Sequence, residues 1–93
     1  MFDWDEANLA HIARHGVTRE EVEDAMSIAP IDLMRQYYED EDRFVQLGVT
    51  SAVRVLVVIT TWRGDLIRVV PAYPAPALLQ RQYWEERRQI YGD

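Results

Sequence analysis

Apolar positions that recur at helical spacing predict two helices in the N-terminal third of the chain. In the first helix Leu9, Ile12 and Ala13 share one side, and Asp3 or Asp5 can cap its start by accepting a hydrogen bond from a free backbone N–H. The helix is expected to end at the dipeptide "HG", because glycine readily takes the left-handed conformation that follows a last helical turn.

The second helix is expected to begin at "TREE". Thr18 and Glu21 have the spacing of a capping box, in which each side chain accepts a hydrogen bond from the backbone of the other residue. Val22 and Ala25 then fall on a core-facing side. Pro30 ends the helix, since proline cannot continue the helical hydrogen-bond pattern.

Alternating and continuous apolar runs predict four strands in the middle of the chain. The second strand alternates, whereas the third is apolar on both faces for much of its length, as is typical of a central strand. An acidic turn, "YEDED", separates the first two strands, and "RGD" joins the last two in a tight hairpin. The predicted strands are residues 31–38, 43–49, 53–62 and 66–70.

Three prolines mark the passage from the last strand to a final helix. Pro71 and Pro74 make this passage stiff and non-helical, and Pro76 suits the first position of a helix over residues 76–91. The order of two helices, four strands and one helix predicts a single α+β domain over residues 1–93. A four-stranded antiparallel sheet is expected to carry its helices on one face.

Composition narrows the classes of protein to which the chain can belong. It has 93 residues and no cysteine, which excludes disulfides and thiolate metal sites and fits a reducing cytoplasm. No apolar run approaches the roughly 18–20 residues that a bilayer span requires, and the acidic start "MFDWDE" is unlike a signal peptide. We therefore expect a folded cytoplasmic protein without a membrane partner.

Charge is unevenly distributed along the chain, whose net charge is −6. Residues 1–42 carry twelve acidic residues and three arginines, a net charge of −9. Residues 43–93 carry four acidic residues and seven arginines, a net charge of +3. The C-terminal half is therefore locally basic, although so acidic a chain is not an obvious nucleic-acid binder. Every basic residue is an arginine, whose guanidinium fork is the better phosphate ligand.

Two histidines four residues apart, His11 and His15 in "HIARHGV", are the first candidates for chemistry. Both lie on one face of the predicted helix, so they can in principle bind zinc together. However, zinc proteases need a glutamate directly after the first histidine, where this chain has Ile12, and no third ligand follows. The pair can instead act as acid–base groups or near phosphate, since imidazole titrates near neutral pH, or can stabilise the end of the helix.

Arginines on the predicted strands form the second candidate group. Arg43, Arg54, Arg63 and Arg68 can bind successive phosphates and neutralise the dianionic transition state of RNA cleavage, or form salt bridges with the many acidic residues. Tyr73, expected just beyond the last strand, is a candidate proton donor, a base-stacking platform or a packing residue. The simplest catalytic option is a metal-free reaction in which an RNA 2′-hydroxyl attacks its own phosphodiester.

The opening stretch "FDWDEANLAHIARHGVTREEVEDAM" resembles the start of the BrnT family of bacterial type II toxins. The resemblance continues through "RFVQLGV", the hairpin "LVVITTWRGDLIRVV" and a closing helix with a late tyrosine. It implies a RelE-like fold, metal-independent endoribonuclease activity without a cofactor, and neutralisation by a BrnA-type antitoxin with a ribbon-helix-helix domain. It also implies that the antitoxin contacts operator DNA and that the complex represses its own operon.

The sequence departs from the family pattern at "VVPAYPAP". Pro71 replaces a hydroxyl residue, and Tyr73 stands where an arginine is expected. Two interpretations follow: an active endoribonuclease, or a catalytically weak or inactive module that keeps the toxin fold and acts through its protein partner. A stripe of Trp84 and Tyr91 on the last helix also predicts a homodimer or a heterotetramer with the antitoxin.

For an active enzyme the sequence predicts no metal ligands and two sets of site residues. The first set supplies phosphate-binding and acid–base groups for catalysis, and the second binds RNA nearby. The catalytic candidates are Arg43, Arg63, Arg68, His15 and Tyr73, and the RNA-binding candidates are Arg14 and Arg54.

Overall fold

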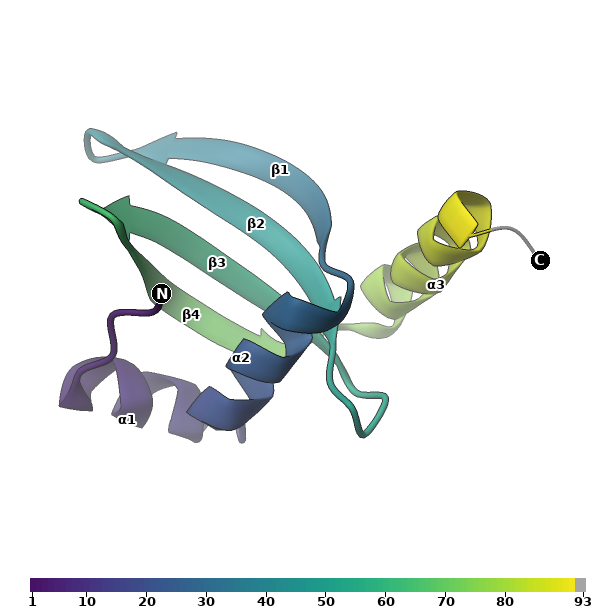
Figure 1. The fold of residues 1–93 in the computed structure, drawn as a ribbon, viewed down its shortest axis with the longest axis horizontal. Helices are drawn as coiled ribbons and strands as arrows, with labels where there is room; N and C mark the ends of the chain where they lie inside the picture. Colours follow the sequence, from purple (N-terminus) through teal and green to yellow (C-terminus); the bar gives the residue numbers. More distant parts are fainter. Residues whose placement is uncertain (92–93) are drawn as a thin grey trace.

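The computed structural model describes the backbone of residues 1–91 and the side chains of residues 1–88. Its helices and strands follow the predicted order (Figure 1), and the four strands pair antiparallel in the order β1-β2-β3-β4. The predicted α+β class is therefore confirmed. The elements are α1 (Glu6–Arg14), α2 (Arg19–Ile28), β1 (Ile31–Tyr38), β2 (Glu41–Val49), β3 (Val55–Arg63), β4 (Leu66–Pro74) and α3 (Ala77–Tyr91).

Both N-terminal helices begin at predicted capping residues. Asp5, rather than Asp3, caps α1, and its carboxylate accepts the N–H of Asn8 at 2.8 Å. Thr18 and Glu21 form the reciprocal capping box of α2. Among the described residues, no helix is long and apolar enough to cross a membrane.

The last strand is longer than predicted and runs to Pro74. Val58 of β3 pairs with Ala72 and Thr60 pairs with Val69, so β4 carries one extra residue between these pairs, a β-bulge. β4 is an edge strand, where the missing N–H of a proline interrupts no ladder on its outer side. The strand therefore continues through prolines that were expected to end it.

β3 begins two residues later than predicted, at Val55. Residues 50–53 form a tight turn, in which the N–H of Val53 donates to the carbonyl of Thr50 at 2.8 Å. Val53 has a φ of 63°, a left-handed conformation that a strand does not contain. The apolar run alone gave no sign of this turn.

Two separate hydrophobic cores lie on opposite faces of the sheet. Leu56 and Val58 of β3 join the core under α1 and α2, whereas Val55 and Val57 join Tyr83 of α3 on the other face. The prediction of helices on one face is therefore wrong, because a strand that is apolar on both faces needs cover on both. Figure 1 shows α3 over one end of its face, with the far end of that face free of the described helices.

α2 approaches the sheet most closely at Gly48 of β2. A Cβ atom added to this glycine would lie 2.6 Å from the carbonyl oxygen of Ala25 in α2. The absence of a side chain at this position therefore allows the helix to lie against the sheet.

Candidate active site

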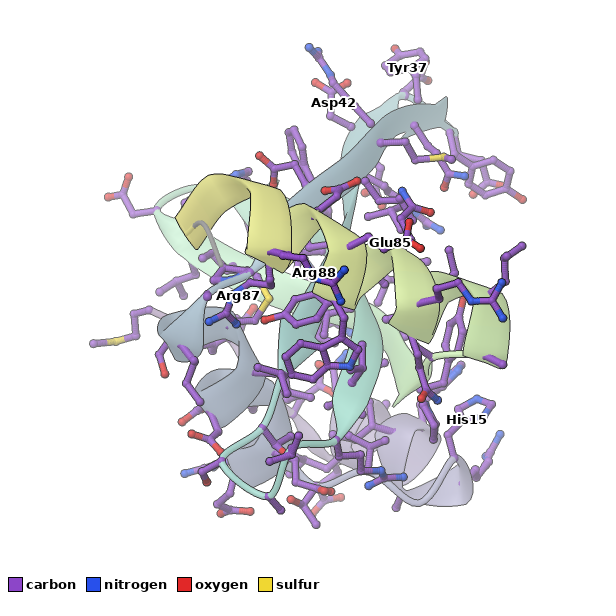
Figure 2. All side chains as sticks on the ribbon, turned by 90° about the vertical axis from the view of Figure 1, so that its right-hand side faces the viewer. His15, Tyr37, Asp42, Glu85, Arg87 and Arg88 are labelled. Carbon is purple, nitrogen blue, oxygen red and sulfur yellow. The ribbon has the colours of Figure 1, made fainter. Side chains whose placement is uncertain are left out.

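The end of α1 lies beside the edge strand β4 and brings two predicted acid–base groups together. The ring centroids of His15 and Tyr73 are 6.0 Å apart, and those of His15 and His11 are 5.7 Å apart. Both histidines are exposed, whereas Tyr73 is half-buried against the core under α3. Figure 2 shows His15 well apart from the labelled charged side chains of α3. One imidazole and one phenol are therefore neighbours on this surface.

The sequence predicted that Tyr73 lies just beyond the last strand, but the structure places it within that strand. It belongs to β4 and pairs with Val57 of β3. Because the bulge leaves Val69 and Ala72 facing the same core, Tyr73 faces the opposite side of the sheet. The backbone irregularity at the prolines thus determines the face on which this phenol lies.

Arg68 lies farther along β4 and is tied to the start of α1. Its Nη1 donates to Oδ2 of Asp5 at 3.0 Å, and its side chain is 19% exposed. The backbone N–H of Asn8 and the guanidinium of Arg68 hold the pKa of the Asp5 carboxyl below its ordinary value. A shallow hollow of about 150 Å³ between α1 and β4 is lined by Arg68, Asn8 and His11, among others. Arg68 therefore borders the same surface as the histidines.

Arg43 lies on β2, two strands away from Arg68. Phe44 pairs with Thr60, so Arg43 comes beside Thr61 of β3, which pairs with Arg68 on its other side. With strands about 4.8 Å apart, the two arginine backbones are separated by roughly 10 Å. Arg43 donates to Glu41 at 3.1 Å and lies 4.9 Å from the ring centroid of Tyr38. The two arginine backbones thus lie on either side of β3, while the Arg43 guanidinium contacts the β1–β2 hairpin and the Arg68 guanidinium contacts Asp5.

Arg63 and Arg14 are not part of this group in the structure. Arg63 is the last residue of β3 and pairs with Leu66 across the hairpin turn. It lies six residues along β3 from Val57, the residue that pairs with Tyr73. That separation corresponds to about 20 Å along the strand. Arg14 is exposed in the last turn of α1, and neither guanidinium has a hydrogen-bond or ion-pair partner among the residues that the structure describes. Arg14 precedes His15 and can reach a ligand bound near it.

Arg54 braces the turn between α1 and α2. Its Nη1 donates to the carbonyl of Gly16 at 2.9 Å and to Oε2 of Glu21 at 2.8 Å. Although partial burial acts to raise it, the pKa of Glu21 is held below its ordinary value by the hydrogen bonds from Thr18 and Arg54. The guanidinium is committed to these structural contacts.

The structure adds no third zinc ligand to the pair of histidines within the described residues. Within the described part of the chain, no three His, Cys, Asp or Glu side chains gather into a group that could hold a metal ion. His11 and His15 stand together as a pair only.

Asn8 and Asp5 also adjoin the candidate site, which the sequence did not indicate. Asn8 is buried and its Nδ2 donates to the carbonyl of Val69 at 2.8 Å, which ties α1 to β4. Asn8 precedes His11 and His15 by three and seven residues, the spacing of one helix face. That spacing was visible in the sequence, but its orientation toward β4 was not.

One family of known proteins matches most of this chain. The model of a family described as "Ribonuclease toxin, BrnT, of type II toxin-antitoxin system" matches residues 4–77, which include α1, α2 and all four strands and end at the first residue of α3. No individual curated protein matches the sequence. The family match covers most of the chain, and the chain therefore belongs to the BrnT family of ribonuclease toxins from type II toxin–antitoxin systems.

Proposed function

We propose that this toxin cleaves RNA without a metal ion, at the surface where the end of α1 meets β4. The observation that carries the proposal is the contact between the rings of His15 and Tyr73, with Arg68 on the same strand. Histidine suits proton transfer near neutral pH, and a phenol can donate a proton. Arginine can neutralise the charge that develops on phosphorus-bound oxygens.

In the proposed reaction, the neutral imidazole of His15 removes the proton from a ribose 2′-hydroxyl. The resulting oxygen attacks the adjoining phosphorus, and the bond from phosphorus to the 5′-oxygen of the next nucleotide breaks. Tyr73 donates its proton to that leaving oxygen. The products are a 2′,3′-cyclic phosphate and a 5′-hydroxyl, which balances the reaction without water or a metal ion.

Arg68 is the arginine best supported for the phosphate, although its partner Thr61 lies four residues, or about 13 Å, along β3 from the partner of Tyr73. Only its Nη1 is bound to Asp5, and a guanidinium has five N–H donors, so the ion pair leaves donors for a phosphate oxygen. Arg43, on the far side of Thr61, is a second ligand for the same or the adjoining phosphate. Arg14 can contact RNA beyond His15. The contacts of Arg54 favour a structural role, and no described contact of the Arg63 side chain supports a role for it in the site.

The test is cleavage of RNA by the purified toxin in excess EDTA, with analysis of the product ends. His15→Ala, Tyr73→Phe and Arg68→Ala are each expected to lower kcat by about a hundredfold or more, while the protein stays folded. Arg19→Ala is the matched control, because Arg19 is exposed and its one ion pair among the described residues, with Glu20, is long at 4.0 Å. Cleavage that needs added metal, or that survives all three changes, would contradict the proposal.

The half-buried position of Tyr73 and the ion pair of Arg68 favour a second candidate. A toxin fold with these groups committed to packing and pairing would be catalytically weak and would act through its antitoxin. Expression of the chain alone separates the two functions: slowed growth that the antitoxin relieves supports the enzyme. Normal growth together with a stable antitoxin complex supports the binding module.

The finer identity of the partner also belongs to this proposal. A type II system implies an antitoxin, and we propose a ribbon-helix-helix protein that carries the complex to operator DNA in the cytoplasm. The toxin itself would not contact the operator. Mass measurement of the purified complex, with and without operator DNA, would show the stoichiometry and which chain the DNA requires.

A further inference from the structure

The two edges of the sheet are treated differently by the chain. At β4, the N–H of Asp3 donates to the carbonyl of Ile67 and the N–H of Ile67 donates to the carbonyl of Met1, both at 2.8 Å. Asn8 binds a third backbone group of this edge, at Val69. At the opposite edge, the backbone of β1 hydrogen-bonds only to β2 within the part of the chain that the structure describes. One edge is therefore covered and the other is open.

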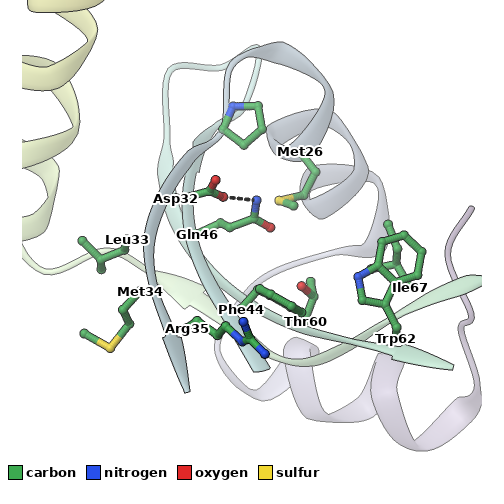
Figure 3. Close-up of a pocket in the computed structure, with 11 residues that line it drawn as sticks. Met26, Asp32, Leu33, Met34, Arg35, Phe44, Gln46, Thr60, Trp62 and Ile67 are labelled. Atoms are coloured by element: carbon green, nitrogen blue, oxygen red, sulfur yellow. Dashed lines mark hydrogen bonds between the residues drawn. The ribbon is translucent and has the colours of Figure 1, made fainter. Parts of the chain in front are cut away.

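Large apolar side chains are exposed along the open edge. Met34, Tyr37 and Tyr38 of β1 are 52%, 71% and 53% exposed. Figure 3 shows Met34 projecting outward from β1, on the side away from the rest of the sheet, whereas Leu33 is partly buried against the core under α3. Unpaired backbone next to exposed apolar side chains is the arrangement that binds an added strand.

A groove runs from this edge across the face of the sheet beyond the end of α2. Its volume is about 530 Å³, and Met26, Phe44 and Trp62 are among the residues that line it (Figure 3). Trp62 is 57% exposed in the absence of a partner. The groove gives an apolar surface on which a partner segment can continue after it leaves the edge.

Charge favours a basic partner over a second copy of this chain. Residues 31–42 carry five acidic residues and one arginine, a net charge of −4. A second copy would bring the same −4 to the interface and a total of −6 to the complex. A basic segment would meet opposite charge at the turn between β1 and β2.

We infer that the outer edge of β1 is the docking site of the antitoxin, which adds an extended segment there as a fifth strand. Alternating apolar residues of that segment contact the exposed side chains of β1 and the groove, and basic residues lie beside the acidic turn. The inference rests on membership of a type II system and on the open edge. It does not depend on His15, Tyr73 and Arg68, which lie at the end of α1 and on β4, although Arg43 of β2 contacts Tyr38 of the docking edge.

Hydrogen exchange of the purified toxin, alone and in complex with the antitoxin encoded beside its gene, tests this directly. Amides of residues 31–38 are expected to exchange more slowly in the complex, by about tenfold or more, because strand addition gives their outward N–H groups partners. Protection elsewhere with unchanged exchange over 31–38 would overturn the inference. A failure of RNA cleavage with this protection intact would count against the catalytic proposal alone.

A charge variant supplies a second, independent test. Glu39 and Asp40 have φ values of 49° and 64°, and asparagine tolerates this left-handed region well. Glu39→Asn with Asp40→Asn is therefore expected to fold, to raise the Kd for the antitoxin about fivefold at low salt, and to weaken its salt dependence. The matched control, Glu6→Gln with Glu20→Gln, makes the same charge change on α1 and α2. Equal weakening in both pairs would overturn the inference.

The oligomeric state and the hydrogen exchange of the free toxin distinguish the antitoxin from a second copy as the occupant of the edge. We expect residues 31–38 to stay unprotected in the free toxin, whether light scattering gives a monomer or a homodimer formed through α3. A dimer in which residues 31–38 are protected would assign the edge to a second copy of the chain and would overturn the inference.

Discussion

The guanidinium of Arg68 lies 3.0 Å from a carboxylate oxygen of Asp5, the residue that caps α1. One ion pair thus joins the strand that carries Tyr73 to the helix that carries His15. The carboxylate also places a negative charge beside the arginine that is proposed to bind RNA phosphate. The ion pair therefore has two opposite effects on RNA binding. It orders the candidate site, and its negative charge weakens the attraction of that site for a polyanion.

Asp5→Asn separates these effects. Asparagine caps helices as well as aspartate does, so α1 should persist while the negative charge is lost. We expect the KM for RNA to fall by about twofold to fivefold, with kcat little changed. Steady-state cleavage assays check this, with Asp3→Asn as the control, because it makes the same charge change without touching Arg68. A loss of kcat would mean instead that the ion pair positions Arg68.

Asp24 makes stability depend on pH in the acid range. The backbone N–H and hydroxyl of Ser51 donate to its carboxylate at 2.6 and 2.7 Å, and they hold the pKa of Asp24 below its ordinary value of 3.8. Because the folded-state pKa is the lower one, this contribution is complete above about pH 5 and is lost as the pH falls through the folded-state value.

Asp24→Asn should therefore be less stable than the parent near neutral pH, and the difference should shrink in acid. Urea unfolding between about pH 3 and pH 7 measures it. Asp65→Asn, in the β3–β4 turn, is the control, since Asp65 is exposed and bonds to no other described side chain. A difference that stays constant with pH would assign the effect to lost hydrogen-bond geometry rather than to charge.

Gly48→Ala should destabilise the protein by about 1–3 kcal/mol, because the new Cβ would meet the backbone of α2. Thermal or urea unfolding gives the value. Gly64→Ala is a useful contrast: its Cβ would meet nothing within 4 Å, but its φ of 61° strains any L side chain. A cost of about 1 kcal/mol is expected there. A larger loss at Gly64 than at Gly48 would contradict the close approach of α2 to the sheet.

Arg54→Ala should lower stability without lowering cleavage. The change removes the hydrogen bonds to Gly16 and Glu21 that hold the α1–α2 turn, and a loss of about 1 kcal/mol is expected. RNA cleavage at a temperature well below unfolding should match the parent. A clear rise in KM with unchanged stability would return Arg54 to the RNA-binding set.

Local signals in the sequence predicted the helix starts and the strand order well. The capping box of Thr18 and Glu21 involves neighbours in the chain, so its physics is contained in a short segment. The same holds for Asp5 and for the turns that follow β1 and β3. The length of β4 was not predictable in this way, because its prolines are tolerated only on an edge strand, and edge position is a property of the whole sheet.

The site was predictable as residue types but not as an arrangement. His15, Tyr73 and Arg68 were all candidates, and the bulge in β4 decides on which face Tyr73 lies. The partner of Arg68 lies 63 residues earlier in the chain, and nothing local distinguishes it from the other acidic residues. Arg54 illustrates the reverse case, since its role as a brace depends on a fold-dependent contact with Gly16.

The short N-terminal segment that lies along β4 also sets a limit on self-assembly. Fibres that grow by edge-to-edge pairing need two open edges in every molecule, one to join the growing end and one to accept the next copy. With residues 1–3 hydrogen-bonded to Ile67 and Asn8 bound to Val69, only the β1 edge is free of such contacts in the part of the chain that the structure describes. Edge-to-edge pairing can therefore occur once for each molecule, so it stops at a dimer and does not continue into a fibre.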